Sequence, residues 1–391
     1  MANNINIKEV ISDKNSAFNI KIFKIGDLKI ERPTKVIDLK NLTKHLILNS
    51  KNSFEKIIME PAKLVNVKTI NSILDELKDF KIRELFGLKV WQEEYPTILS
   101  STLNFNPYNE YKNLKNISGY FDYYYNFSDP FLLIPNIKIE KYDIKTKKKI
   151  PIIGIDKYVK FVEECYEILD YKNKKPIFVP LSLRLKMSDI KTIAKKYISK
   201  EFFNIWYDFE GSAVTKPKIS RIRAFLREFE ENGRIDDIII FATNIKREII
   251  SNIKDEFSPS SDILLSLLGA NIIGVNREPP RIINAPPPTK EELKNLRIHK
   301  ARVFLSDNYY YQKIINSNIE KELQKTLMIP RNNILFNSKL LDDEFKRQAD
   351  YFLDNLKIQD YILNKRMIQQ YKNGDLKKDL FEPQTKMSDW F

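Results

Sequence analysis

The sequence predicts an α/β protein, specifically a TIM-type (β/α)8 barrel with a hairpin insertion and a C-terminal helical extension. Eight short apolar runs have the length of strands, and amphipathic helical stretches separate the clearest of them. These clearer runs start roughly 27 to 47 residues apart, close to the size of one strand–helix unit. The chain has 391 residues, more than the roughly 250 of a typical barrel, which leaves length for an appendage. An open doubly wound sheet is the alternative, but no Gly-x-Gly-x-x-Gly motif follows any run.

The predicted strands fall into a weakly marked group and a clearly marked group. The clear ones are nearly continuous apolar runs, which is typical of parallel strands buried on both faces. The three weak strands come first in the chain, at Pro33–Leu39, Lys56–Met59 and Thr97–Leu103. The five clear strands follow, at Asp129–Pro135, Pro176–Leu181, Phe203–Asp208, Asp237–Ala242 and Asn271–Val275.

Amphipathic helices are predicted between the later strands. In the stretch from Lys218 to Glu231, apolar residues recur every three or four positions and give the helix one apolar face. The predicted helices are Lys157–Leu169, Ser188–Ser199, Lys218–Glu231 and Asp262–Leu268.

Two segments interrupt or end this repeat. Lys138–Ile153 alternates with period two on both sides of a basic tip at Lys145–Lys149, which predicts a β-hairpin insertion. Ala285–Pro288 is the clearest linker, and Thr289–Glu292 forms a capping box that begins a helical region reaching to about Tyr371. We therefore expect a barrel over 1–284 and a helical extension over 289–391.

The charge of the chain indicates an anionic partner. Lys and Arg total 66 against 52 Asp and Glu, which gives a net charge of +14. Such an excess commonly attracts phosphate backbones, although a Lys-rich genome would produce it as well. We expect nucleic acid as the partner. The candidate phosphate contacts, which are equally compatible with solvated faces, are Lys147, Lys148, Lys149, Arg221, Arg223 and Arg227.

Cysteine and histidine counts exclude several classes of site. One cysteine, Cys165, forbids an internal disulfide and any multi-cysteine metal site, and two histidines make a histidine-based metal site improbable. We expect no metal and no cofactor. No apolar signal region and no apolar run of 18 residues is present, so we expect a cytoplasmic protein without a membrane partner.

Polar residues after the predicted strands are the candidates for function, because the sites of barrels lie at the carboxyl ends of strands. Asp208 and Glu210 are the catalytic candidates, since two carboxylates at i and i+2 share one face of a strand. If that face is the barrel interior, their repulsion should raise one pKa; otherwise they only close or cap a loop. The candidate substrate-binding residues are Ser100, Ser101, Asn136, Arg184, Asn244, Asn276 and Arg277.

Several segments between Phe18 and Tyr311 resemble the tRNA-guanine transglycosylase family. In Ser260–Gly274 a helix ends in glycine before a strand, and Pro279–Arg281 stands where the family has Pro-Thr-Arg. Leu296–His299 is similar to the family's post-barrel helix. Near the N-terminus, the family's opening strand pair and its entry into the barrel are similar to Phe18–Ile20, Ile25–Leu28 and Arg32–Thr34. The resemblance implies a barrel that acts on guanines of tRNA or DNA.

The chain departs from this family at its functional positions. The resemblance would put a nucleophilic aspartate near Gly274 or Asn276 and a base-recognising aspartate near Ser100, and none of these is a carboxylate. Of the family's zinc ligands, three cysteines and a histidine, only His299 has a counterpart.

These departures favour a nucleic-acid-binding protein that is either a non-catalytic or a divergent member of the family. Such a chain would act as a homodimer or as a heterodimer with a catalytic paralogue. One alternative is an active guanine or 7-deazaguanine transglycosylase, a pentosyltransferase that uses a substitute carboxylate such as Asp208. The other is an unrelated barrel enzyme that binds a small phosphorylated substrate through Arg184 or Arg277.

Overall fold

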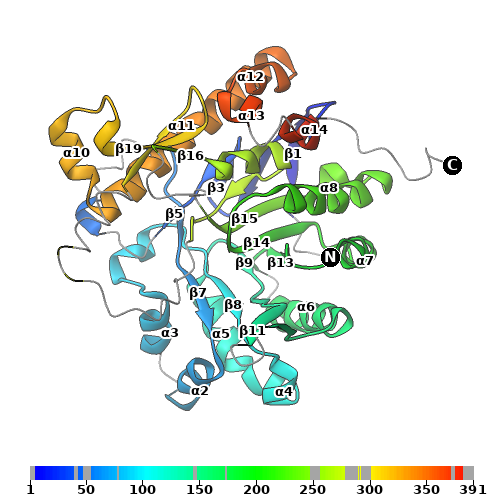
Figure 1. The fold of residues 1–391 in the computed structure, drawn as a ribbon. Helices are drawn as coiled ribbons and strands as arrows, with labels where there is room; N and C mark the ends of the chain where they lie inside the picture. Colours follow the sequence, from blue (N-terminus) through cyan, green and yellow to red (C-terminus); the bar gives the residue numbers. More distant parts are fainter. Residues whose placement is uncertain are drawn as a thin grey trace.

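A computed structural model shows a mixed α/β fold, with a curled parallel sheet in the shape of a half-barrel and helices on its outer face (Figure 1). It describes residues 5–38, 43–46, 54–76, 79–143, 148–171, 174–246, 256–277, 289, 291, 301–370 and 375–381. The largest sheet has six strands, all paired in parallel. In spatial order they are β4 (Thr34–Lys35), β17 (Ile272–Ile273), β15 (Ile239–Ile245), β14 (Asn204–Ser212), β13 (Ile177–Ser182) and β9 (Leu132–Leu133).

Further short strands extend the same parallel arrangement. They form two small sheets. Each contains a strand that lies within a few residues, along the chain, of a strand in another parallel sheet. The sheets are β5 (Ile37–Asp38) with β6 (Met59–Glu60), and β7 (Ala62–Val65) with β8 (Ser100–Leu103) and β10 (Asn136–Ile137). Each of the eight predicted strand positions therefore contains a strand with a parallel partner.

Three of the four predicted helices are α-helices that follow one another along the outer face of the sheet. They are α6 (Ile155–Asp170), α7 (Met187–Ser199) and α8 (Lys216–Glu231), and α7 packs between the other two. The fourth, η4 (Ser261–Leu268), is a 3-10 helix. The remaining helices of this part are α2 (Val67–Glu76), α3 (Asp79–Phe86), η1 (Val90–Glu94), α4 (Pro107–Tyr111), η2 (Leu114–Ile117), α5 (Ser118–Phe127) and η3 (Ile235–Asp237).

An antiparallel sheet at the N-terminus packs against the inner side of the parallel strands. It consists of β1 (Ile7–Ser12), β2 (Asn19–Ile25) and β3 (Leu28–Ile30). Phe23 and Ile25 of β2 join one buried cluster with Trp206 and Phe241 of the parallel strands. The next residue along β14, Tyr207, instead packs against Phe225 of α8 in the outer core. Because neighbouring residues of a strand face opposite sides, Trp206 and Asp208 face inward.

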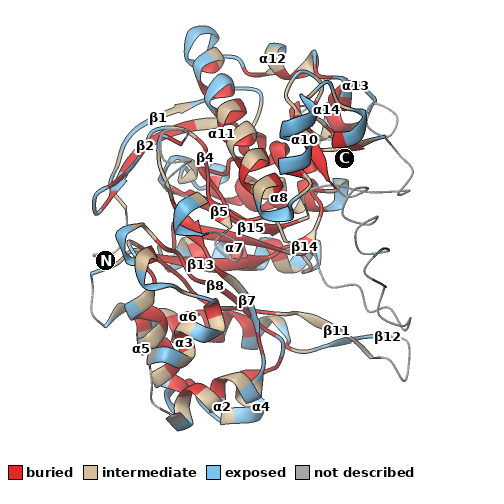
Figure 2. Cartoon of the chain, turned by 90° about the vertical axis from the view of Figure 1, so that its left-hand side faces the viewer, coloured by how far each residue is buried: buried red, intermediate tan, exposed pale blue. Residues whose placement is uncertain are grey.

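The predicted hairpin insertion is present. β11 (Glu140–Asp143) pairs antiparallel with β12 (Lys148–Pro151), and Figure 2 shows both strands projecting from the body of the molecule. The hairpin follows β10, so it leaves the fold from the carboxyl end of that strand.

The expectation of a continuously helical extension is wrong at residues 302–313. β18 (Arg302–Leu305) and β19 (Tyr310–Lys313) form a hairpin, and β19 also pairs with β16 (Phe257–Pro259). The aromatic and β-branched residues Val303, Phe304 and Tyr311 favour a strand once β16 offers an edge to pair with. The sheet β16–β19–β18 thus joins the two predicted domains. The linker Ala285–Pro288 lies outside the described residues, and so do two residues of the capping box, Lys290 and Glu292.

Helices make up the rest of the extension. Asp342 accepts a hydrogen bond from the backbone N–H of Lys35 at 3.0 Å, which anchors the longest of these helices to β4. None of the helices within the described residues combines the length and apolar character that crossing a bilayer requires. The elements are η5 (Ile314–Asn316), α10 (Lys321–Leu327), α11 (Pro330–Asn355), α12 (Gln359–Leu363), α13 (Arg366–Gln370) and α14 (Asp375–Phe381).

Candidate functional site at the strand ends

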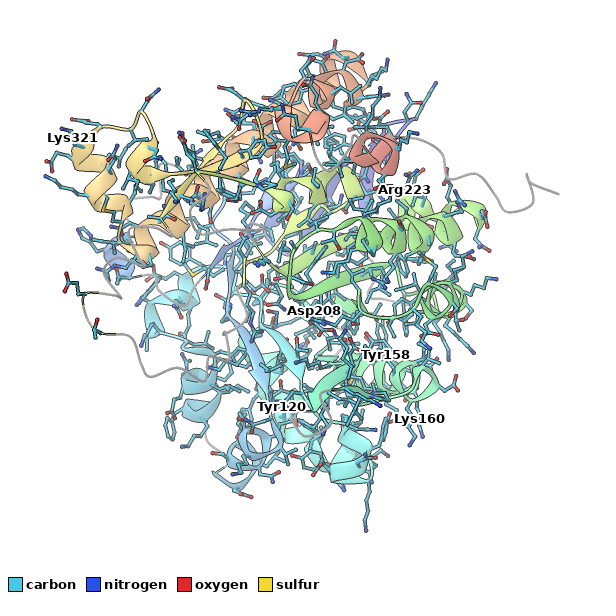
Figure 3. All side chains as sticks on the ribbon, in the orientation of Figure 1. Tyr120, Tyr158, Lys160, Asp208, Arg223 and Lys321 are labelled. Carbon is cyan, nitrogen blue, oxygen red and sulfur yellow. The ribbon has the colours of Figure 1, made fainter. Side chains whose placement is uncertain are left out.

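Asp208 is the last residue of β14 before its regular pairing with β13 and β15 is interrupted, and it is fully buried in the middle of the molecule (Figure 3). Its carboxylate accepts four hydrogen bonds, two on each oxygen, and the donors come from four strand ends. The donors are Thr102 Oγ1 at 2.7 Å, Asn136 Nδ2 at 3.0 Å, Asn244 Nδ2 at 3.0 Å and the backbone N–H of Glu210 at 2.8 Å. The polar face of this strand end is therefore the inner one.

These contacts make Asp208 a positioning residue in the folded chain. A carboxylate offers about four lone-pair directions, and here each is used. All four donors are neutral, and hydrogen bonds to a charged acceptor are stronger than those between neutral groups. Asp208 thus holds the ends of β8, β10, β14 and β15 together. Its predicted catalytic role stays a prediction.

Glu210 lies beside Asp208 and differs from it in its partners. Ser182 Oγ donates to Glu210 Oε1 at 2.9 Å, and Arg184 Nε lies 3.0 Å from Oε2 without the alignment of a hydrogen bond. Burial, and then the charge of Asp208, raise the pKa of Glu210 to about 7, while Arg184 opposes the rise. The expected repulsion between the two carboxylates contributes, but burial is the larger cause. Glu210 can therefore exchange a proton near neutral pH.

Two residues at adjacent strand ends have left-handed backbone conformations. Glu210 has φ of 47° and Asn244 has φ of 56°, a region that residues other than glycine rarely adopt. Both are held by the same atom, since the Glu210 N–H and Asn244 Nδ2 donate to Asp208 Oδ1. The buried Asn244 Oδ1 accepts no hydrogen bond from any described residue. The strain and the unused acceptor favour a site for a ligand here.

A second buried carboxylate, which the sequence reading missed, lies at the end of β6. Glu60 is fully buried and accepts hydrogen bonds from Thr243 Oγ1 at 2.6 Å and from the Val275 N–H at 2.8 Å. The hydroxyl of Ser100 lies beside it. Burial raises the pKa of Glu60 to about 7, although these donors oppose the rise. Glu60 directly follows the predicted strand Lys56–Met59. A carboxylate at the end of a predicted strand is a candidate site residue, so this position could have identified Glu60 from the sequence.

Lys35 of β4 is the other group that the sequence reading missed. Its ammonium group donates to the carbonyl of Gly274. Burial lowers the pKa of Lys35 to about 8, and the charges of Asp262 and Glu60 oppose this. A lysine inside a short predicted strand is most often a surface residue, and its inward direction follows only from the register of β4 against β17.

Gly274 follows β17 at a position that has no room for a side chain. A Cβ atom there would collide with the Glu60 carboxylate and would lie 2.5 Å from Oγ1 of Thr243. The resemblance drawn from the sequence would put a nucleophilic aspartate near this position. The carboxylate of Glu60 fills that space instead.

Other predicted substrate-binding residues lie apart from Asp208. Ser101 points outward, where its hydroxyl lies 3.0 Å from that of Tyr120 in α5, because Ser100 and Thr102 occupy the inner face. Asn276 donates to Asp262 at 2.9 Å, and the backbone N–H of Arg277 bonds to the carbonyl of Ile245 at 2.8 Å. The cluster around Asp208 thus includes Asn136, Arg184 and Asn244, but not Ser101.

The predicted phosphate contacts divide between the two ends of the strands. Arg221 donates to the Leu183 carbonyl at 3.2 Å, beside Arg184, and the exposed Lys148 and Lys149 lie on the hairpin. Lys147 lies outside the described residues. Arg223 and Arg227 lie farther along α8, away from this group. Arg223 donates to carbonyls of α14, and both line a cleft of about 470 Å³ near the amino ends of β15 and β17.

Neither metal chemistry nor homology assigns a function to these groups. Within the described ranges, no cluster of histidine, cysteine, aspartate and glutamate has an arrangement that could hold a metal ion. No family model matches the chain, and no curated protein has a significantly similar sequence. Its function therefore has to be inferred from the strand ends themselves.

Proposed function

We propose that this chain is a nucleic-acid-binding protein built on a closed (β/α)8 barrel, related to the tRNA-guanine transglycosylases, and that it binds over the carboxyl ends of the strands. The strand pairings support closure. β5 pairs with β6, β7 with β8, β8 with β10, and β9 with β13, and each of these pairs is joined to the next by a few residues of chain. From β13 the pairing runs through β14, β15 and β17 back to β4, which leads into β5.

The observation that carries the proposal is the polar cluster at the strand ends with basic groups beside it. Asn244 Oδ1 and Glu210 Oε2 are buried acceptors without a hydrogen-bond donor among the described residues. Arg184 lies 3.0 Å from Glu210, and Arg221 donates to the carbonyl of Leu183, the residue before Arg184. The hairpin with Lys148 and Lys149 projects from the same end of the strands (Figure 2). The net charge of +14 supports attraction of a polyanion to this end.

Two buried carboxylates, those of Asp208 and Glu60, support a binding role without base exchange. Asp208 has no lone pair left for a substrate, and the Gly274 position is filled by Glu60. A partner subunit, either a second copy or a catalytic paralogue, would then supply the chemistry.

Base exchange by this chain itself is the second candidate, and Glu60 favours it. Glu60 supplies a carboxylate next to Gly274, with a pKa of about 7. As nucleophile, Glu60 would form a bond to the anomeric carbon while the departing base keeps the electrons of the glycosidic bond. Incubating the protein and its Glu60→Gln variant with labelled guanine and tRNA or DNA tests this. Incorporation that is lost in the variant supports base exchange, and no incorporation in the wild type excludes it.

Binding of tRNA and duplex DNA at several salt concentrations tests the main proposal. We expect the logarithm of the affinity to fall linearly with the logarithm of the salt concentration. The double variant Lys148→Gln/Lys149→Gln should bind more weakly, with a salt slope smaller by about one for each phosphate group that is no longer neutralised.

A double variant on α10 is a matched control. Like the hairpin variant, it replaces two exposed lysines, one of which pairs with a glutamate. Lys149 lies 2.6 Å from Glu140, and Lys325 lies 2.7 Å from Glu322. The control is Lys321→Gln/Lys325→Gln, and its affinity should fall much less. Salt-independent binding, or equal losses in the two double variants, would refute the proposal.

A further inference from the structure

We propose that a phosphodiester group binds between Arg184, Lys218 and Arg221 at the start of α8, next to Glu210. This rests on the proposed nucleic-acid-binding function and names the site that would hold the backbone. Lys218 was not among the residues that the sequence indicated. It lies in the first turn of α8, and Arg221 follows it one turn later.

The positions of the three cationic groups follow from their contacts with neighbouring loops. The Lys218 ammonium group donates to the Ala213 carbonyl at 3.0 Å and to the Ser212 hydroxyl, two residues after Glu210. Arg221 donates to the carbonyl of Leu183, the residue before Arg184. Arg184 itself lies 3.0 Å from Glu210. Lys218 experiences the charges of Arg184, Arg221 and Glu210, so the three cations lie near one another and near this carboxylate of the strand end.

Positive charge at this place is not fully balanced by the carboxylates around it. Burial lowers the pKa of Lys218 to about 8, and the charges of Arg184 and Arg221 lower it further, while Glu210 and Asp208 oppose them. Lys138, at the base of the hairpin, adds a fourth cation that acts on Glu210.

The opposing carboxylates are already engaged by other groups. Glu140 lies 3.9 Å from Arg184 but is shared with Lys149 at 2.6 Å. Asp208 is saturated by its four neutral donors. When Glu210 takes up a proton, the cluster of cations has a deficit of negative charge that an anionic ligand would fill.

The start of α8 adds a second reason to expect an anion. The helix has 16 residues, its first turn holds Lys216 and Lys218 with no acidic residue, and the Thr215 side chain makes no capping hydrogen bond. Cations at a helix N-terminus are unfavourable with respect to the helix dipole, whereas anions bind there.

An independent sign of a ligand is the buried Glu210 carboxyl group itself. Its side chain is 5% exposed, and Oε2 has only the ion pair with Arg184 at 3.0 Å and accepts no hydrogen bond from the part of the chain that the structure describes. A protonated Glu210 would have a donor to place on a phosphate oxygen, while the ionised form would repel it. Binding should therefore weaken as pH rises through the titration of Glu210.

Titration calorimetry of the 391-residue chain with two probes tests the subsite. Inorganic sulfate is a dianion and a thymidine trinucleotide without terminal phosphate carries only phosphodiesters, so neither probe changes charge between about pH 5 and 8. Arg221→Ala should weaken both probes at least tenfold, because a charge-assisted hydrogen bond is lost. Arg366→Ala, which removes an exposed arginine of α13, should leave both affinities unchanged.

The pH dependence gives a second readout that does not require removal of a cation. Between pH 5.5 and 7.5, below the pKa of Lys218, wild-type affinity for sulfate should fall severalfold, and Glu210→Gln should abolish this fall. A pH profile that is unchanged in Glu210→Gln overturns the role of this group.

The outcomes separate this proposal from the proposed function. If neither probe binds while tRNA still binds in a salt-sensitive way, the subsite is wrong and the nucleic-acid-binding function stands. If sulfate binding depends on Arg221 but the trinucleotide and tRNA do not bind, the site takes a small phosphorylated ligand and the phosphodiester proposal fails. Loss of both probes in Arg221→Ala, with thermal unfolding unchanged, supports it.

Discussion

Replacing Asp208 by asparagine should destabilise the fold by an amount that follows from its hydrogen bonds. The new side chain keeps the shape but offers one acceptor oxygen and one donor amide. With its oxygen in the place of Oδ1, it keeps the bonds from Asn244 and from the Glu210 N–H. Its amide then faces Thr102, whose hydroxyl can turn and accept, and Asn136, whose amide cannot.

Asn136 cannot escape this contact by turning over. Its oxygen accepts the N–H of Ile137 at 2.9 Å, which can only donate, and the hydroxyl of Tyr158 lies 2.9 Å from the same oxygen. One buried donor thus faces another, which costs about 1–3 kcal/mol. Loss of the charged acceptor weakens the remaining bonds by about 1 kcal/mol more. The free energy of unfolding of Asp208→Asn should therefore be about 2–4 kcal/mol smaller.

The same geometry predicts a rescue. In the double variant Asp208→Asn/Asn136→Asp, the carboxylate at position 136 keeps the Ile137 N–H on one oxygen and accepts the new amide on the other. Urea unfolding followed by circular dichroism measures all four members of the cycle. We expect the two changes to couple favourably by at least about 1 kcal/mol. Additive effects, or an Asp208→Asn protein as stable as the wild type, would show that the hydrogen bonds of Asp208 do not hold the four strand ends together.

Three further predictions concern titration, packing and metal content. Burial raises the pKa of Glu60 and Glu210 to about 7, so the folded state binds protons more readily than the unfolded state, and the free energy of unfolding should fall as pH rises from about 4.5 to 7. Chemical unfolding in Glu60→Gln and Glu210→Gln should show shallower slopes, each group contributing at most about 1.4 kcal/mol per pH unit; identical slopes in all three proteins would contradict this. Gly274→Ala should lower the free energy of unfolding by about 1–3 kcal/mol through overpacking, whereas Gly154→Ser, where a Cβ meets nothing within 4 Å, should not. Elemental analysis should find no stoichiometric zinc, because one cysteine and two histidines are too few for a usual ligand set, and one zinc per chain would refute this.

The parts of the fold that the sequence revealed are those whose interior is apolar. Trp206 and Phe241 lie in strands buried on both faces, so their runs are continuous and easily read. The first three strands are weak for a reason that the structure explains. Lys35, Glu60 and Ser100 turn polar side chains inward at their ends, so the apolar pattern breaks where the cluster lies. Lys35 and Glu60, which obscured two of these strands, were missed as candidates, whereas Ser100 was among the predicted substrate-binding residues.

The pairing register of the strands determines which side chains face inward, and a single sequence does not show that register. Ser100 and Ser101 look equivalent in the sequence, but only Ser100 faces inward, and Thr102, which was not singled out, donates to Asp208. The hairpin of β18 and β19 depends on the edge of β16, some 50 residues earlier in the chain, and local periodicity cannot show that edge.

Positioning and reactivity are divided among different carboxylates at these strand ends. A carboxylate that fixes four loops must have its lone pairs occupied, and Asp208 meets that condition. A group that exchanges protons with a ligand needs an oxygen that is not saturated with hydrogen bonds and a pKa near the working pH. Glu210 meets both conditions, since its Oε2 has an ion pair with Arg184 but no hydrogen bond from the described residues. Burying an ionisable group is costly, and an apolar residue would satisfy packing alone. The side chain of Glu210, held in a strained turn by Asp208 and faced by cations, is therefore where a ligand should make its decisive contact.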